Sequence, residues 1–258
     1  MASPQGNYAG GPPTRLYNGV TTARVTENLG MFPLPLQSQV YNYFNDFTTY
    51  SAGDWTVTAG GVGSAVASTV GVGGQLLVTT ATSGVESITG GLNTAFVNAT
   101  SSINGLKVWF RARVLLDATV ANPNYEIGLT TATATFNGNT DGVYFTKPTA
   151  TANWNFVIKG AGTATTVALP TNGTGIPTGS TWIDLGYYFD GKGMFYIYFN
   201  NICIGTYGAN NSGMVGSLGS SLVNLPLATV LLGPTFLNGF NTATSLLTVD
   251  FVYAACEI

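Results

Sequence analysis

The sequence predicts an all-β protein: one antiparallel two-sheet sandwich or jelly roll with an extended N-terminal arm. Short segments rich in β-branched and aromatic residues, separated by Gly, Asn, Asp and Pro, follow one another along the 258 residues. No window shows the 3.6-residue period of an amphipathic helix. The first forty residues instead carry prolines, including Pro33 and Pro35, that favour extended backbone. We therefore divide the chain into an arm, residues 1–40, and one sandwich domain, residues 41–258.

The central strands are predicted from runs of Val, Ile, Leu, Phe, Tyr and Thr bounded by turn residues. These runs are residues 74–81, 106–116, 124–132, 142–147 and 154–160. The glycine-rich stretch 58–74 has strands on both sides. It is therefore interpreted as a loop or as loose edge strands of the same domain, and not as a linker.

Residues 182–207 are predicted to form a three-stranded antiparallel meander. Alternate positions are apolar in the first two strands, which gives each a buried face: Ile183, Leu185, Tyr187 and Phe189, then Phe195, Ile197 and Phe199. The sequence DGKG at residues 190–193 supplies glycines for the first tight connection, and Asn200–Asn201 supplies the second turn.

A last strand is predicted within LLTVDFVYAACEI, residues 246–258. Leu247, Val249, Phe251 and Tyr253 alternate along it and would share one face. Many short strands separated by turns favour a closed sandwich, and no part of the chain indicates a second domain.

The composition predicts a charge-poor surface. Hydrophobic residues make up 45% of the chain and charged residues only 7%, where about 25% is usual. Such a surface has a weak defence against self-association, so we expect a protein that assembles. The net charge is -3 and the eight basic residues form no run, which argues against nucleic-acid binding. No segment reaches the roughly 18 apolar residues of a membrane span.

Catalytic and metal-binding patterns are missing from the sequence. There is no histidine, which removes the commonest general base and the Ser-His and Cys-His dyads. Glycosidases of sandwich type place carboxylates on alternate residues of one strand. None of six acids has an acidic residue two positions later: Glu86, Glu126, Asp141, Asp184, Asp190 and Asp250. We therefore expect no enzyme activity and no cofactor.

Two smaller patterns receive structural interpretations. Cys203 and Cys256 are interpreted as small apolar residues in strands, since the first residues show no secretory leader and synthesis in a cytoplasm is expected. The stretch NGNTDG, residues 137–142, holds amide oxygens and Asp141 and is the nearest approach to a calcium loop. We interpret it as a polar hairpin loop capped by its own side chains.

One strand combines a tryptophan with three cations. Lys107, Trp109, Arg111 and Arg113 share one face of residues 106–116. In one interpretation this is a ligand face, with Trp109 as a platform for a sugar and the arginines as hydrogen-bond donors. In the other, the cations pair across strands with an acid such as Glu126, and Trp109 packs beneath a loop.

Three stretches resemble strands of concanavalin-A-like jelly rolls: FNDFTTYSAGDWTVT at residues 44–58, GMFYIYFNNICIGTY at 193–207 and LLTVDFVYAA at 246–255. Together with the leading LYNGVTTARVTENLGMFPLP, the whole is similar to virion structural proteins of tailed bacteriophages. Those proteins join an extended N-terminal segment to such a sandwich. The resemblance implies location in the virion, after synthesis in the host cytoplasm, and a role in capsid decoration.

The arm carries apolar residues that must lie on something, because soluble monomers avoid long exposed apolar strips. The main hypothesis is a non-enzymatic cement protein whose arm binds the major capsid protein and sister subunits. A homo-oligomer is expected, and a trimer would match three-fold sites of a shell. The arm residues assigned to this binding are Arg15, Leu16, Tyr17, Arg24, Met31, Phe32, Leu34 and Leu36. The alternative is a carbohydrate-binding, lectin-like module of a phage tail or fibre that reads a surface glycan.

Overall fold

The computed structural model describes the strands and most of the turns that join them. The described residues are 33, 35, 40–49, 51–59, 65–69, 74–80, 85–90, 97–98, 101–117, 123–133, 135–148, 154–169, 181–191, 193–208, 224–226, 232–239 and 244–257. The arm residues assigned to partner binding lie outside these: Arg15, Leu16, Tyr17, Arg24, Met31, Phe32, Leu34 and Leu36. Within the described ranges, no helix is long and apolar enough to cross a membrane.

Two antiparallel sheets make up the domain, as predicted. Sheet A has the order β15 (Ile202–Gly208), β14 (Met194–Phe199), β13 (Trp182–Phe189), β8 (Val108–Leu116), β17 (Ser245–Glu257), β4 (Gln75–Thr80) and β3 (Ala65–Thr69), with β1 (Val40–Asn45) also paired to β17. Sheet B has the order β12 (Thr163–Ala168), β11 (Asn155–Gly160), β10 (Gly142–Lys147), β9 (Asn124–Thr130), β16 (Gly233–Gly239), β5 (Val85–Gly90) and β2 (Trp55–Ala59). A separate pair, β6 (Val97–Asn98) and β7 (Ser101–Gly105), and a 3-10 turn, η2 (Ala52–Asp54), complete the described elements.

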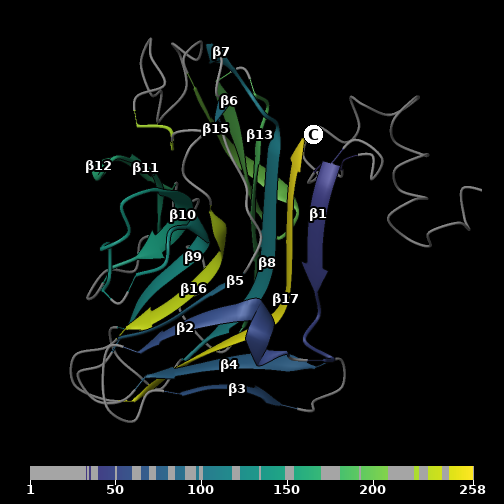
Figure 1. Ribbon diagram of the computed structural model, residues 1–258, viewed down its shortest axis with the longest axis vertical. Helices are drawn as coiled ribbons and strands as arrows, with labels where there is room; N and C mark the ends of the chain where they lie inside the picture. The colour runs from purple at the N-terminus through teal and green to yellow at the C-terminus, as the bar shows by residue number, and fades with distance from the viewer. Residues whose placement is uncertain are drawn as a thin grey trace, which may run out of the picture.

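The longest strand, β17, organises sheet A. It pairs with β8 on one side along most of its length. On the other side its first half pairs with β4 and its second half with β1. Figure 1 shows β8 and β17 side by side, with β1 beyond β17 at the edge of the sheet. β17, near the end of the chain, therefore holds together three strands from its first half.

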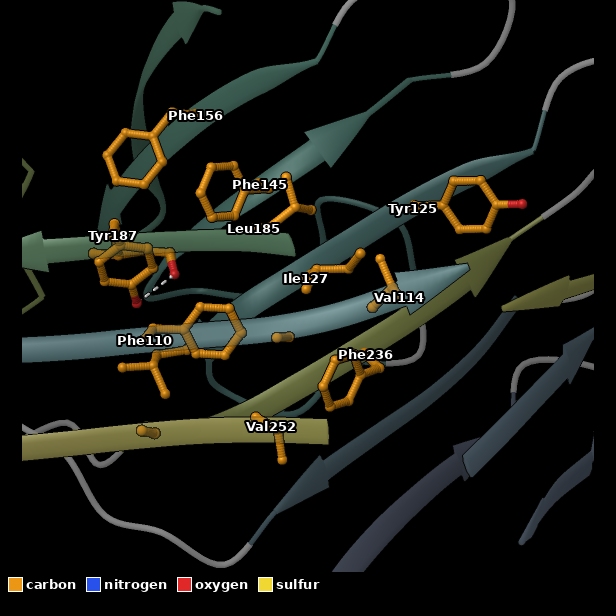
Figure 2. Close-up of a cluster of buried hydrophobic side chains, with 14 of the residues drawn as sticks. Phe110, Val114, Tyr125, Ile127, Phe145, Phe156, Leu185, Tyr187, Phe236 and Val252 are labelled. Carbon is orange, nitrogen blue, oxygen red and sulfur yellow. Dashed lines mark hydrogen bonds between the residues drawn. The ribbon is translucent and has the colours of Figure 1, made fainter. Parts of the chain in front are cut away.

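The inward faces of the two sheets form one apolar core. Figure 2 shows side chains from both sheets meeting there, among them Phe110 of β8, Tyr187 of β13 and Phe156 of β11. The Tyr187 hydroxyl donates a hydrogen bond to the backbone oxygen of Val143 at 3.0 Å, which links sheet A to sheet B. The predicted inward residues Ile183, Leu185, Tyr187 and Phe189 are all buried, as the alternation requires.

The meander of residues 182–207 is confirmed as β13, β14 and β15. Asn200 and Asn201 have φ values of 47° and 67°, so the asparagines supply the left-handed positions of the second turn. Gly191 and Gly193 have φ values of 73° and 111° in the first turn. The glycine-rich stretch 58–74 contains β3, an edge strand of sheet A, which agrees with the edge-strand interpretation.

The alternation predicted for the last strand is wrong after its midpoint. A bulge in β17 lies between Val249 and Phe251, and leaves Asp250 outside the paired register with β8. Leu247 and Val249 point into the core, whereas beyond the bulge Val252 and Ala254 do so. Because a bulge adds one residue to one strand, it exchanges the two faces. Phe251 and Tyr253 are thereby moved to the outer face, where both are only half-buried.

A buried polar contact set, here called the inter-sheet clamp, joins the sheets at one end of the core. The side-chain amide of Asn238 on β16 donates to the backbone oxygens of Val78 at 2.8 Å and Ser245 at 3.0 Å, both in sheet A. The Ser245 hydroxyl donates back to Asn238 Oδ1 at 3.0 Å. The backbone N–H of Ser245 donates to Thr80 Oγ1 at 3.2 Å. Asn238, Ser245 and Thr80 are fully buried, so these bonds replace those to water.

Candidate functional site

The outer face of sheet B is covered over β9, β10 and β11 by a loop of the same chain. The loop between β9 and β10 folds over this face, and its Asn137 contacts three adjacent strands. The backbone N–H of Asn137 donates to Glu126 of β9, and its backbone oxygen accepts from Lys159 Nζ of β11 at 2.7 Å. The Tyr144 hydroxyl of β10 donates to Asn137 Oδ1 at 3.2 Å. Glu126 is fully buried beneath the loop, so a ligand cannot reach its carboxylate.

Burial dominates the ionisation of Glu126. Removal from water disfavours the charged form and raises the pKa to about 7, although the Asn137 hydrogen bond and the charge of Lys159 act in the opposite direction. The folded state therefore binds a proton more tightly than the unfolded chain does. The stability from this group is fully present below about pH 4.5 and is lost as the pH rises through about 7.

Glu126→Gln tests this linkage. We expect similar free energies of unfolding for wild type and variant near pH 4, and a variant more stable by up to about 3 kcal/mol near pH 8. Urea unfolding across this range measures the difference, in which the other titrating groups cancel. Parallel pH profiles for the two proteins would mean that Glu126 titrates normally in the folded state.

The stretch 137–142 is a loop, but the side chains of Asn137 and Asp141 bond to neighbouring strands and turns and do not cap the loop itself as the sequence suggested. Asp141 Oδ1 accepts a hydrogen bond from the backbone N–H of Ala161 at 3.0 Å, which fixes the loop against the β11–β12 turn. The described residues contain no group of three or more His, Cys, Asp or Glu side chains arranged to hold a metal ion. Asp141 is thus occupied with the backbone of the domain.

The outer face of sheet A presents aromatic rings. Trp109 on β8 lies opposite Tyr188 on β13, which lies opposite Tyr196 on β14. The Trp109 and Tyr188 rings stack with centroids 5.2 Å apart, and the Tyr188 and Tyr196 rings stack at 5.7 Å. We call these three residues the aromatic ladder. In the neighbouring cross-strand row, Tyr198 and Tyr253 lie on the same face.

Trp109 is an inner member of this ladder and not an open platform. Its side chain is only 6% exposed, and it packs in a small second cluster with Val40, Tyr198 and Ala255. One ring face is covered by Tyr188. Trp109 Nε1 is buried and has no hydrogen-bond partner among the described residues. Tyr188 and Tyr196 are only partly buried, so the accessible rings lie toward the β14 end of the ladder.

The three cations of the predicted ligand face are each paired with a carboxylate of sheet A. Lys107 Nζ lies 2.8 Å from Glu257 Oε1, Arg111 3.1 Å from Asp184 Oδ2, and Arg113 3.2 Å from Asp250 Oδ2. The suggested pairing with Glu126 is wrong, because Glu126 lies in sheet B beneath the β9–β10 loop. The idea of cross-strand ion pairs holds, but with different acids.

These ion pairs are held by aromatic neighbours. The Arg111 guanidinium lies 5.3 Å from the ring centre of Phe251, and that of Arg113 lies 5.3 Å from Trp182. Burial opposes ionisation of Glu257, but hydrogen bonds from the Lys107 side chain and backbone, together with its charge, lower the pKa below its usual value. The three cations and three acids neutralise one another. The face therefore offers hydrogen-bonding groups without net charge.

The tyrosine hydroxyls on this face remain donors at neutral pH. Burial, followed by electrostatic repulsion from Asp190 and from the Cys203 thiol once it ionises, raises the pKa of Tyr196 above its ordinary value. The pKa of Tyr198 is raised further, again mainly by burial. Cys203 on β15 and Cys256 on β17 are not joined in a disulfide; burial raises the pKa of Cys203, and Cys256 is buried. Both cysteines therefore behave as the small apolar residues predicted.

The sequence reasoning identified Trp109 and the cations but missed the tyrosines. The sequence does contain a pattern that could have identified them. Tyr188, Tyr196 and Tyr198 alternate with the buried residues of the meander and therefore face outward. Outward positions of a solvated sheet are usually polar or charged. Tyrosine at three of them indicates a surface with a use beyond solubility.

Comparisons with known proteins agree on architecture. No protein-family model matches the chain, and no curated protein matches it. Among solved structures, basic winged bean lectin with Tn-antigen is matched at a TM-score of 0.54 and 8% identity, over 84% of this chain and 98% of the lectin. The glycoside hydrolase family 16 endo-glucanase from Bacteroides ovatus is matched at 0.54 and 10% identity, over 81% and 98%.

The sandwich is a concanavalin-A-like jelly roll. The CBM2 module of the evolved Dit of Lactobacillus casei BL23 phage J-1 is also similar, with a TM-score of 0.50 and 14% identity over 85% of this chain and 97% of that module. Botulinum neurotoxin type C, whose cell entry depends on two ganglioside molecules, is matched at 0.51 and 12% identity over 84% of this chain. The chain spans only 47% of that toxin chain. At these identities the likeness concerns the fold alone.

Proposed function

We propose that the protein is a carbohydrate-binding module that holds an uncharged glycan on the outer face of sheet A. The observation that carries the proposal is the aromatic ladder, whose partly exposed Tyr188 and Tyr196 lie among paired charges. Sugars present apolar C–H faces and hydroxyl edges, which suit amphipathic tyrosine rings. Similarity of fold to a lectin and to a carbohydrate-binding module supports this choice.

The balance of charge sets the class of glycan. An acidic sugar needs a cation that is free to pair with it, whereas Lys107, Arg111 and Arg113 each lie beside a carboxylate. An uncharged sugar instead needs stacking surface and hydrogen bonds, which the tyrosine rings and hydroxyls supply. The proposed ligand is therefore a neutral surface glycan.

The module acts by binding and not by cleavage in this proposal. Glycoside hydrolysis requires two carboxyl groups facing one sugar bond. Glu126, which has the raised pKa expected of a general acid, is sealed beneath the β9–β10 loop. The acids of the aromatic face are held by lysine or arginine. This arrangement supports binding, and not cleavage, at the outer face of sheet A.

Tyr196→Ala is the sharpest test. A glycan array identifies a neutral oligosaccharide, and calorimetric titration with it measures the affinity of each variant. Removal of an aromatic anchor is expected to weaken binding at least about tenfold. Val57→Ala, which shortens a 45%-exposed residue on sheet B, is the matched control and should bind like wild type. Absence of binding across the array, or unchanged affinity of Tyr196→Ala, contradicts the proposal.

A second proposal is a structural role on a tailed-phage virion, with attachment to the major capsid protein through the arm. The favouring observation is that β1 begins where the arm ends and exposes Tyr41 and Phe44, in a chain with only 7% charged residues. Location in the virion and capsid decoration follow from this proposal. It is compatible with a glycan-binding face that points outward.

Purified particles test the virion role directly. Mass spectrometry should detect the chain in them, and a variant lacking residues 1–39 should fold but fail to bind particles stripped of the protein. The truncation ends before Val40 because Val40 is buried in β1. Absence from particles contradicts the virion role. Full binding by the truncated chain contradicts attachment through the arm.

A further inference from the structure

Among the described strands, β1 lies at an edge of sheet A. It pairs with β17 on one side, and no described strand pairs with its other side. Figure 1 shows β1 at the margin of the sheet beyond β17. Such an edge presents unpaired backbone N–H and C=O groups, which natural proteins usually protect with charged residues, proline or a bulge. The strand Val40–Asn45, VYNYFN, contains no charge and no proline, and its register with β17 is regular.

The backbone groups on this edge can be assigned. The N–H of Glu257 donates to the oxygen of Lys107, so the Glu257 backbone faces the β8 side and away from β1. Val40 lies opposite Glu257 and therefore belongs to a pair without mutual hydrogen bonds. Backbone N–H and C=O groups point to opposite sides of a strand at successive residues. Those of Val40, Asn42 and Phe44 therefore all point away from β17.

The side chains add an apolar surface to this edge. Tyr41 is 65% exposed and Phe44 is 62% exposed, which makes them two of the four large exposed hydrophobic residues within the described ranges. They point to opposite sides of the sheet, so both faces of β1 carry an exposed ring. Phe44 also contacts the Phe251 ring, with centroids 6.2 Å apart.

We propose that β1 pairs with β1 of a second copy of this chain, antiparallel and about a two-fold axis through Asn42. An axis normal to the sheet keeps side chains on their own face, so residues that oppose one another must have the same parity. Centring on Asn42 sets Phe44 against Val40 of the second copy, and Tyr41 against Tyr43. The outward backbone groups of Val40, Asn42 and Phe44 then meet in hydrogen-bonded pairs.

Self-pairing fits this edge better than another partner does. Centring on Tyr43 would set Phe44 against Asn42, and Tyr41 against Asn45, so each exposed ring would meet an amide. The edge offers no charge by which a charged partner could be selected. The net charge of -3 on 258 residues gives weak repulsion between two copies. The two-fold interface is of the self-complementary type common in homodimers.

Introducing a charge of either sign at Asn42 tests both the dimer and its register. Sedimentation of the full chain should show a dimer. Asn42→Lys places two like charges face to face at the axis, and Asn42→Asp does the same with the opposite sign. Each variant should dissociate at about tenfold higher concentration than wild type. An equimolar mixture of the two should form a heterodimer, because lysine then faces aspartate.

The controls keep the result unambiguous. Asn42 is exposed, so the circular dichroism and melting temperature of the monomeric variants should match those of wild type. Ile202→Lys adds a charge at another exposed site, on β15 at the opposite edge of sheet A, and should leave the dimer intact. A monomeric or trimeric wild type overturns the proposal, as does a dimer indifferent to charge at position 42. These results do not depend on glycan binding.

Discussion

Phe156→Ala is expected to lower the free energy of unfolding by about 3–5 kcal/mol, the usual cost of removing a buried phenylalanine. Phe156 projects from β11 of sheet B toward Tyr187 of sheet A (Figure 2), with ring centroids 5.4 Å apart. It also meets the rings of Phe195 at 5.4 Å and Tyr207 at 6.3 Å in the same sheet. Its removal leaves a cavity between the sheets that the surrounding rigid rings fill poorly. Urea unfolding measures the loss.

Ile202→Ala is the matched control for Phe156→Ala. Ile202 is 64% exposed, so its truncation should change the free energy of unfolding by less than about 0.5 kcal/mol. Phe156→Leu should lie between the two, because it restores part of the lost volume. A loss below about 1 kcal/mol for Phe156→Ala would mean that the two sheets do not meet at this ring.

Asn238→Ala is expected to cost about 3–4 kcal/mol through the inter-sheet clamp. The alanine cannot donate to Val78 or Ser245, so two backbone oxygens in the core lose their partner at this point. A buried polar group without its partner costs about 1–3 kcal/mol. Thermal and urea unfolding measure the effect.

Ser245→Ala distinguishes the two hydrogen bonds donated by the Asn238 amide from the one donated by the Ser245 hydroxyl. It removes the hydroxyl that donates to Asn238 Oδ1 but keeps both donations from the Asn238 amide, so the cost should be about 1 kcal/mol. Equal losses in Asn238→Ala and Ser245→Ala would place the stabilising contact in the hydroxyl and would contradict the role given to the amide.

Local patterns predicted the meander well. Alternation over Trp182–Phe189 and Met194–Phe199 shows the inward faces, and the turn residues between strands have strong backbone preferences. The bulge at Asp250 escaped notice because it adds no distinctive residue. A bulge is a property of pairing with a partner strand, here β8, which lies far away in the sequence.

The candidate site was predicted only in part for a related reason. Parity correctly grouped Trp109, Arg111 and Arg113 on one face, since parity is local. Their acidic partners depend on which strands are neighbours, and sequence separation conceals that Asp184 and Asp250 flank β8 whereas Glu126 does not. The depth of Trp109 depends likewise on Tyr188, which only the fold brings beside it.

The central position of β17 has a consequence for synthesis of the protein. β17 follows every other described strand in the chain, yet β1, β4 and β8 all pair with it. During synthesis on the ribosome, the backbone groups of these three strands that pair with β17 therefore remain unpaired until β17 emerges. Pairings between distant parts of a chain form slowly, and waiting strands can join the wrong neighbour. The uncharged, aromatic β1 emerges first and waits longest, which makes it the segment of sheet A most in need of protection before folding is complete.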